Sequence, residues 1–380
     1  MNAVVEVGMT LNYVVDSSCT KYRDLHAIGM AMEEPLTYGT FHKRILALAT
    51  KLIKEGIRKG DHIAILSENS HNWGIAYLAI VRIGAIAVPI LPDLPESDVH
   101  HILNEMQVKA LFTTQKQIEK IYELRNELQS IVITLDDYAA EIGIVPVVTF
   151  STFLVEAITA FEENPDDPVF PTVGEDDIAS ILYTSGTSGY SKAVMLSHKN
   201  LTANGYAAAD LMDIPPGSVW LSILPMSHTY EFTCGFMLPL ICGGRIAYAG
   251  KAPTPAILQK LCAHEKPFAI FAVPLVLEKI YKKRVLPQIE KSSVLKMMCK
   301  VGMSRKLIYR KIGRKLLDFF GGNLQLMGVG GAALNPDVEK FLHEAHFPYL
   351  IGYGMTESAP LIAGGPSGDR TIAIGSTGKP

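Results

Sequence analysis

The stretch ASILYTSGTSGYSKAVML, residues 179–196, decides the fold, because it predicts a strand, a polar loop and a second strand. Apolar residues fill both ends, and the loop between them consists mainly of Ser, Thr and Gly before it reaches Lys192. Gly186 and Gly189 allow the backbone to turn its N–H groups inward. Four hydroxyl groups add donors, those of Thr184, Ser185, Thr187 and Ser188. Such a nest of donors beside one positive charge suits a polyphosphate.

Other interpretations of this loop remain open from the residues alone. Turn chemistry favours an ordinary surface hairpin rich in Ser and Gly. The common phosphate-binding pattern G-x-x-x-x-G-K-[ST] does not fit the stretch. The loop is therefore either a surface turn or a phosphate site of a different kind.

Length and composition limit the class of protein. A chain of 380 residues with 48% hydrophobic and 19% charged residues predicts a globular protein with more than one core. The net charge of −3 argues against nucleic acid as the main partner. Five scattered cysteines favour a reduced compartment, with neither a disulfide framework nor a zinc site. We see no signal peptide in residues 1–13 and expect a cytoplasmic protein, whose oligomeric state the sequence leaves open.

Strand-like and helix-like segments alternate along the chain. Helical spacing of apolar residues covers 40–55, 70–83 and 95–106, and buried strands are predicted at 62–66, 86–90, 110–113 and 131–135. A second set of strands is predicted at 220–224, 244–249, 268–272 and 324–329. This alternation predicts an α/β fold with two mostly parallel β-sheets flanked by helices. Within the first set, capping and core packing are the expected roles of Asn69 and Trp73.

The acidic, proline-bearing segment 162–177 is the clearest break in composition. We place a first α/β lobe at 1–170 and a second lobe at 171–370, with 371–380 as the start of a further part. Residues 296–315 carry eight Lys and Arg residues and no acid. A solvated helix face packed on the second lobe explains this stretch most plainly, and peripheral contact with an anionic membrane is the alternative.

Three later segments contain groups suited to ligand binding. LPMSHTYE at 224–231 places His228 after a strand, and GVGGAAL at 328–334 ends a strand in small residues. Small residues at the carboxyl end of a strand leave room for a flat ring to approach the backbone. GYGMTESAP at 352–360 places Glu357 directly after Thr356. A carboxylate in such a place is a suitable ligand for a hard cation, although a Thr-Glu pair is more often a helix cap.

These segments resemble the ordered motifs of the ANL superfamily of adenylate-forming enzymes. Residues 183–194 are similar to its Y-T-S-G-T-[TS]-G-x-P-K-G-V signature, with departures at Ser188, Ser191 and Ala193. The segments at 352–360, 224–231 and 328–334 resemble its Y-G-x-T-E, L-P-x-x-H and G-G-A-x-L motifs. The resemblance implies the layered N-terminal domain of that superfamily, with ATP, Mg²⁺ and CoA as cofactors.

The resemblance also implies roles for individual residues. Thr184, Lys192 and Glu357 are carried over as catalytic, and Glu357 with Thr184 as the magnesium site. His228, Gly330 and Gly331 are carried over as substrate-binding, with Tyr353 against adenine and Thr356 on the α-phosphate. The remaining nucleotide-binding positions are Ser185, Gly186, Thr187, Ser188, Gly189, Ala332, Gly354 and Met355, in addition to Thr184, Lys192, Gly330 and Gly331.

The implied reaction joins a carboxylic acid to CoA through an acyl-adenylate. Segments 228–232 and 273–281 resemble long-chain fatty acid–CoA ligases, so fatty acid, ATP and CoA are the expected partners. Activation of an aryl or amino acid, and a non-catalytic nucleotide- or acyl-binding module, remain alternatives. A phosphotransferase should show a P-loop or kinase motifs, and neither is present.

The last residues also resemble a family motif. GSTGKP at 375–380 is similar to G-S-x-G-x-P, after which relatives continue into a ribose-binding segment, a hinge and a small domain with a catalytic lysine. We therefore expect this chain to correspond to the large N-terminal domain, without the small C-terminal domain, and to have little or no activity alone.

Overall fold

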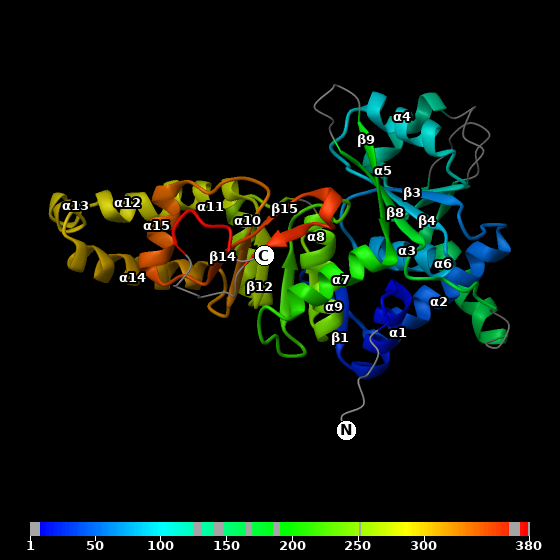
Figure 1. Ribbon diagram of the computed structural model, residues 1–380, viewed down its shortest axis with the longest axis horizontal. Helices are drawn as coiled ribbons and strands as arrows, with labels where there is room; N and C mark the ends of the chain where they lie inside the picture. The colour runs from blue at the N-terminus through cyan, green and yellow to red at the C-terminus, as the bar shows by residue number, and fades with distance from the viewer. Residues whose placement is uncertain are drawn as a thin grey trace.

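A computed structural model of the protein describes residues 8–124, 131–139, 147–164, 169–184, 191–250, 252–364 and 373–378. The described chain forms two seven-stranded sheets flanked by helices, together with a two-stranded ribbon (Figure 1). This confirms the predicted fold class. None of the helices in these ranges is long and apolar enough to cross a membrane.

The first sheet is parallel except at one edge, where the last strand runs antiparallel to its neighbour. Its order is β7-β6-β5-β3-β4-β8-β9. The strands are β3 (His62–Leu66), β4 (Ile86–Ile90), β5 (Ala110–Thr113), β6 (Ile131–Thr134), β7 (Val147–Thr149), β8 (Ile178–Thr184) and β9 (Lys192–Ser197). The predicted strand–loop–strand unit is therefore the β8–β9 edge of this sheet.

The second sheet has the order β14-β13-β12-β10-β11-β1-β2, and only β2 is antiparallel to its neighbour. Its strands are β1 (His26–Met30), β2 (Leu36–Thr37), β10 (Val219–Ser222), β11 (Arg245–Tyr248), β12 (Ala269–Ala272), β13 (Leu326–Val329) and β14 (Tyr349–Ile351). A separate ribbon pairs β15 (Tyr353–Gly354) with β16 (Leu361–Ala363).

The sheets exchange edge strands across the break at 162–177. β1 and β2, from the start of the chain, complete the second sheet, whereas β8 and β9, which follow the break, complete the first. The division into lobes at residue 170 remains a prediction about domains, and neither sheet is formed by one side of it alone.

Helices cover the sheets on their outer faces and fill the space between them (Figure 1). The α-helices are α1 (Leu11–Lys21), α2 (Tyr38–Lys54), α3 (His71–Arg82), α4 (Glu96–Met106), α5 (Gln115–Ile118), α6 (Phe150–Glu163), α7 (His198–Ala209), α8 (Thr229–Glu231), α9 (Leu238–Cys242), α10 (Pro255–Glu265), α11 (Pro274–Ile280), α12 (Leu286–Glu290), α13 (Ser293–Met298), α14 (Gly302–Phe319) and α15 (Pro336–Ala345). Shorter elements are the 3₁₀ turns η1 (Glu119–Leu124) and η4 (Thr356–Ser358) and the π-helical turns η2 (Phe232–Met237) and η3 (Tyr281–Val285).

Caps explain why the helices begin and end where they do. The Ser70 hydroxyl accepts the Trp73 N–H at the start of α3, and Ser197 forms a reciprocal capping box with Asn200 at the start of α7. Gly56 follows α2 with φ of +91°, a left-handed conformation that glycine adopts without strain. Trp73 lies fully buried in the core and stacks on Tyr77, as the core-packing prediction requires.

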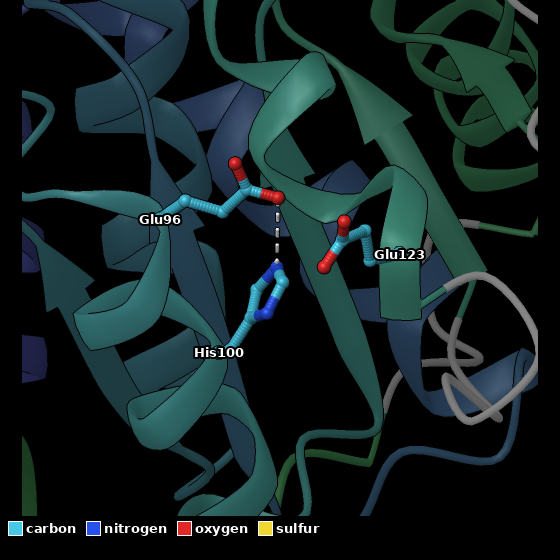
Figure 2. A group of neighbouring side chains, drawn as sticks. All are labelled: Glu96, His100 and Glu123. Atoms are coloured by element: carbon cyan, nitrogen blue, oxygen red, sulfur yellow. Dashed lines mark ion pairs between the residues drawn. The ribbon is translucent and has the colours of Figure 1, made fainter.

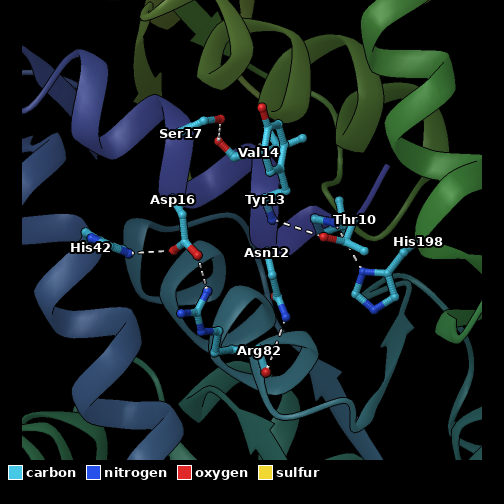
Figure 3. A network of polar contacts seen from close by, with 10 residues as sticks. Thr10, Asn12, Tyr13, Val14, Asp16, Ser17, His42, Arg82 and His198 are labelled. Carbon is cyan, nitrogen blue, oxygen red and sulfur yellow. Dashed lines mark hydrogen bonds and ion pairs between the residues drawn. The ribbon is translucent and has the colours of Figure 1, made fainter. Parts of the chain in front are cut away.

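The N-terminal helix α1 is tied to the first sheet's helices by polar contacts (Figure 3). The Leu11 N–H donates to Nδ1 of the buried His198, at 3.2 Å. Desolvation lowers the pKa of His198 to about 4, so this ring is neutral and can accept that bond. On the next turn Asp16 accepts from His42 at 2.8 Å and from Arg82 at 2.6 Å. Burial alone would raise the pKa of Asp16, but these two bonds lower it.

Candidate active site

The candidate site lies where neighbouring parallel strands of the second sheet end. Strands β14, β13, β12 and β10 are adjacent and parallel, so the segments that follow them meet at one edge of the sheet. His228 lies in the segment after β10, Gly330 directly follows β13, and Tyr353 lies just beyond β14. Sheet topology thus brings together residues that are more than a hundred positions apart in the chain.

A pocket at this edge contains six of the predicted site residues. Its lining consists of His228, Tyr230, Cys234, Gly330, Gly331, Gly352, Tyr353, Gly354, Met355, Pro360 and Leu361. Ala332, Thr356 and Glu357 lie beside this pocket in the chain but are not part of its lining. Residues of three separate motifs thus line one cavity.

Glycines keep this pocket open for specific steric reasons. A Cβ atom on Gly354 would lie 2.1 Å from the Pro360 carbonyl oxygen, a distance that no side chain can occupy. Gly331 has φ of +83°, which strains any other residue. A Cβ atom on Gly330 would lie 3.2 Å from the Tyr230 ring and would narrow the cavity. Small residues at this edge therefore leave the backbone accessible.

Side chains of other elements hold the segment that carries Thr356 and Glu357. The Asn204 amide of α7 donates to the carbonyls of Ser358 and Leu361, and its oxygen accepts the Leu361 N–H. These three bonds fix the C-terminal end of the turn η4 and the start of β16. The turn leaves the Glu357 side chain exposed and Thr356 half-buried.

The β8–β9 edge of the first sheet reaches the same turn. Thr184 pairs with Lys192 across the two strands, and β9 packs beside η4. The Lys192 side chain is exposed, and Thr184 is half-buried. The predicted positions Ser185, Gly186, Thr187, Ser188 and Gly189 lie outside the described residues. The strand that begins at Lys192 thus packs beside the turn with Thr356 and Glu357.

His228 is positioned by the helix that it begins. Its Nδ1 accepts the Tyr230 N–H at 3.2 Å, so Nε2 carries the proton when the ring is neutral. Desolvation by the surrounding protein lowers the pKa of His228, which favours that neutral state. His228 is therefore suited to donating a hydrogen bond to a ligand from Nε2.

The side chain of Asn69 has a role that the sequence analysis missed. The predicted capping role is wrong, because Ser70 caps α3. The Asn69 amide instead crosses to the second sheet, donating to the Leu224 carbonyl at 2.6 Å and the Ser222 hydroxyl at 3.1 Å. Its oxygen accepts the Met226 N–H at 2.8 Å. Asn69 thus fixes the segment that leads to His228, and no local pattern distinguishes such a bridge from a cap.

Glu231 is a second feature that the sequence did not reveal. Its carboxyl group is buried against the π-helical turn η2, where a Cβ atom on Gly235 would lie 2.5 Å from Oε1. Burial raises the pKa of Glu231 to about 8, although a hydrogen bond with Ser222 opposes the shift. A neutral carboxyl group therefore lies directly behind the pocket wall formed by Tyr230 and Cys234.

One further group of possible metal ligands lies on the first sheet's helices, away from this pocket. Glu96, His100 and Glu123 place one ligand atom each within 4.8 Å of one another (Figure 2). His100 Nε2 donates to the Lys120 carbonyl at 2.7 Å, which leaves only Nδ1 for a metal. Both glutamates are exposed. We assign no function to this surface cluster.

Comparisons with known proteins identify the family of this chain. The family model described as AMP-binding enzyme matches residues 15–380. Long chain acyl-CoA synthetase 8 of Arabidopsis thaliana is 25% identical over 91% of this chain and 52% of its own length. The Drosophila melanogaster long-chain-fatty-acid–CoA ligase heimdall is 29% identical over 91% of this chain and 56% of its own. The chain therefore spans about half the length of these curated relatives.

Solved structures share the fold. The N-terminal domain of FACL13 from Mycobacterium tuberculosis matches with a TM-score of 0.75 and 21% identity, covering 97% of this chain and 81% of that one. The anthranilate CoA ligase AuaEII matches with a TM-score of 0.76 and 18% identity, covering 99% of this chain and 64% of that one. With the family model matching nearly the entire sequence, the chain belongs to the family of AMP-binding enzymes.

Proposed function

We propose that this chain is the nucleotide- and acyl-binding part of a long-chain fatty acid–CoA ligase. A carboxylate oxygen of the acid attacks the α-phosphorus of ATP, and pyrophosphate leaves with the bonding electron pair. The resulting acyl-adenylate is then attacked by the thiol of CoA, which releases AMP. ATP supplies the activation, so the tasks of the protein are positioning and charge stabilisation.

The observation that carries this proposal is the meeting of the β8–β9 edge with η4 beside the glycine-lined pocket. In this arrangement Lys192 and Thr184 contact the tail phosphates, and Thr356 contacts the α-phosphate. The exposed ring of Tyr353 stacks on adenine at the mouth of the pocket, where Gly330 and Gly331 leave the backbone accessible. His228 donates from Nε2 to the acyl group or to the incoming CoA.

The residues of η4 also fit a magnesium ion. Mg²⁺ prefers a small number of carboxylate oxygens and retains waters and nucleotide phosphates as its other ligands. Glu357 is an exposed carboxylate in the turn beside β9, and Thr184, which pairs with the first residue of β9, offers a hydroxyl oxygen as a second ligand. When bound, Mg²⁺ would neutralise charge on the phosphates.

The choice of acid rests on the relatives and on the pocket. Both curated relatives above bear names that specify long-chain acids, at 25% and 29% identity. The side of the pocket behind His228 is formed by Tyr230 and Cys234, which suits an apolar chain better than a charged amine.

Calorimetric titration with two probes tests the site. The first probe is MgATP, and the second is a non-hydrolysable sulfamoyl adenosine that carries a palmitoyl group. We expect Lys192→Ala to weaken MgATP binding by about ten-fold to a hundred-fold, since a charged contact contributes roughly 1.5–3 kcal/mol. The same variant should bind the palmitoyl probe unchanged, because that probe has no tail phosphates.

Lys109→Ala, an exposed lysine of the first sheet, is the matched control and should leave both affinities unchanged. Unchanged MgATP binding by Lys192→Ala would contradict the proposal that the β8–β9 hairpin binds the phosphates of ATP. A benzoyl version of the probe that binds as tightly as the palmitoyl version would contradict the choice of a long-chain acid.

A further inference from the structure

Helices α13 and α14 form a basic hairpin, residues 293–319, at one end of the molecule's long axis (Figure 1). The second half of α14 is anchored through buried residues such as Ile312 and Leu316, and Tyr309 of the first half packs on Phe341 of α15. Its Gly313 packs against α15, where a Cβ atom would lie 2.8 Å from the Cβ of Ala345. The other half of α14 and all of α13 contain no buried residue. The hairpin therefore projects from a fixed base.

The projecting part exposes apolar side chains. Met303 is 81% exposed and Leu307 is 64% exposed, and the two lie one turn apart on the same face of α14. Exposed apolar residues also occur on α13 and in the turn between the helices, namely Val294, Met297, Met298 and Val301. A face packed on the second lobe, the plainer prediction from the sequence, accounts for Ile312 and Leu316 but not for this tip.

Positive charges surround the apolar tip. Residues 291–317 contain no Asp or Glu. Arg305 is bound by Glu344 of α15, with both contacts at 2.7 Å. In the described part of the chain, five other basic residues of the hairpin form neither an ion pair nor a side-chain hydrogen bond, namely Lys296, Lys300, Lys306, Lys311 and Arg314. Lys311 and Arg314 follow Leu307 along α14, so the positive charge continues from the tip into the anchored half of the helix.

We propose that the basic hairpin docks this protein on the surface of an anionic lipid bilayer. The apolar tip enters the boundary between headgroups and acyl chains, and the lysines and arginines behind it contact lipid phosphates. Charge complementarity selects this partner, because five unpaired cations around an apolar tip match an anionic surface. Methionine side chains also adapt well to a disordered acyl layer. The docking lies outside the pocket and does not depend on the proposed reaction.

Sedimentation with vesicles tests the proposal on the whole chain. We expect the protein to bind vesicles of phosphatidylcholine mixed with phosphatidylglycerol, and to bind pure phosphatidylcholine far more weakly. Replacing Lys306, Lys311 and Arg314 by Gln should reduce binding by about five-fold per charge, an effect that disappears at high salt. Met303→Ser with Leu307→Ser should reduce it by about ten-fold or more at any salt concentration.

Matched controls lie elsewhere on the surface. Replacement of the exposed residues Lys54, Lys109 and Lys260 by Gln, and Val155→Ser on α6, should leave vesicle binding unchanged. Equal binding to both vesicle types, or equal loss in the control variants, would overturn the proposal. If Met303→Ser with Leu307→Ser instead shifts the oligomeric state and leaves vesicle binding intact, the tip is a contact between copies and the proposal is wrong.

Discussion

The two sheets have the same strand plan but very different carboxyl ends. In each sheet five parallel strands follow the same order, β7-β6-β5-β3-β4 in one and β14-β13-β12-β10-β11 in the other, and an edge pair completes the sheet. At the end of the first sheet, Glu68 accepts from Thr114, Gln117 and Lys116 at 2.8–2.9 Å. At the end of the second, His228, Gly330 and Tyr353 border an open pocket.

Topology therefore does not by itself make a binding site. At the first sheet's edge Glu68, Asn69 and Lys116 line a second pocket, but their polar groups are bonded to one another or to neighbouring segments, which stabilises the fold. The second sheet places glycines and exposed side chains there, which leaves hydrogen-bonding groups for a ligand. The predictions below test this division of roles, beginning with the largest expected effect.

Glu231 should make the second sheet's half of the protein less stable as pH rises. The folded protein holds a proton with a pKa of about 8, whereas the unfolded chain releases it near 4.5. The protonated Glu231 therefore contributes about 5 kcal/mol to the free energy of unfolding below pH 4.5, and this contribution is lost as pH rises to 8. Glu231→Gln should flatten this dependence in urea unfolding between pH 5 and 8, and an unchanged slope would show that Glu231 is ionised in the fold.

His198 should make the protein less stable as pH falls, which is the opposite of the effect of Glu231. The pKa of His198 in the folded protein is about 4, below the ordinary value of 6.5. Its contribution to the free energy of unfolding is therefore present above pH 6.5 and is lost as pH falls to 4. The expected size is about 3 kcal/mol. His198→Asn retains an acceptor for the Leu11 N–H but does not titrate. Unfolding of this variant should change less between pH 7 and 5 than that of the parent, and equal changes would assign acid sensitivity elsewhere.

Substituting one glutamate at the carboxyl end of each sheet compares the two ends directly. Glu357→Gln should abolish most of the magnesium dependence of ATP binding, a change of about ten-fold to a hundred-fold for a charged contact. Glu68→Gln should lower the melting temperature through its lost contacts with Thr114, Gln117 and Lys116. It should leave the ratio of ATP affinities with and without Mg²⁺ unchanged. If the two variants affect that ratio equally, the edges do not differ as described.

Asn69 differs from both groups, because it follows a strand of the first sheet but its side chain positions a segment of the second sheet. Asn69→Ala should weaken binding of the palmitoyl probe by about five-fold, since a hydrogen bond that positions the segment before His228 contributes roughly 1 kcal/mol. Asn72→Ala is its control, because Asn72 bonds only to Leu135 of the first sheet. Equal weakening by both variants would indicate a general loss of stability.

The sequence predicted the parts of the fold that local physics determines. The strand at 62–66 and the helix after Ser70 follow from a buried apolar run and a cap, and both are confirmed. The site residues came from the family resemblance, and six of them line one pocket because strand ends of a parallel sheet share an edge.

Local sequence patterns could not predict contacts between segments that lie far apart in the sequence. The pairing of β1 with β11 joins the start of the chain to residue 246, and no periodicity in either segment predicts this pairing. The bridge from Asn69 to Met226 and the burial of Glu231 beside Gly235 likewise depend on tertiary placement. These features became visible only with the structure.

The exchange of edge strands has a consequence for synthesis on the ribosome. Ile28 of β1 pairs with Ile246 of β11, so 246 − 28 = 218 further residues must be made before that partner exists. At typical elongation rates the wait is roughly ten to forty seconds. Throughout this time β1 has only the short strand β2 as a sheet neighbour, and its other edge is open to wrong partners. Whatever occupies β1 during that interval, a chaperone or the nascent chain itself, must release it when β11 emerges.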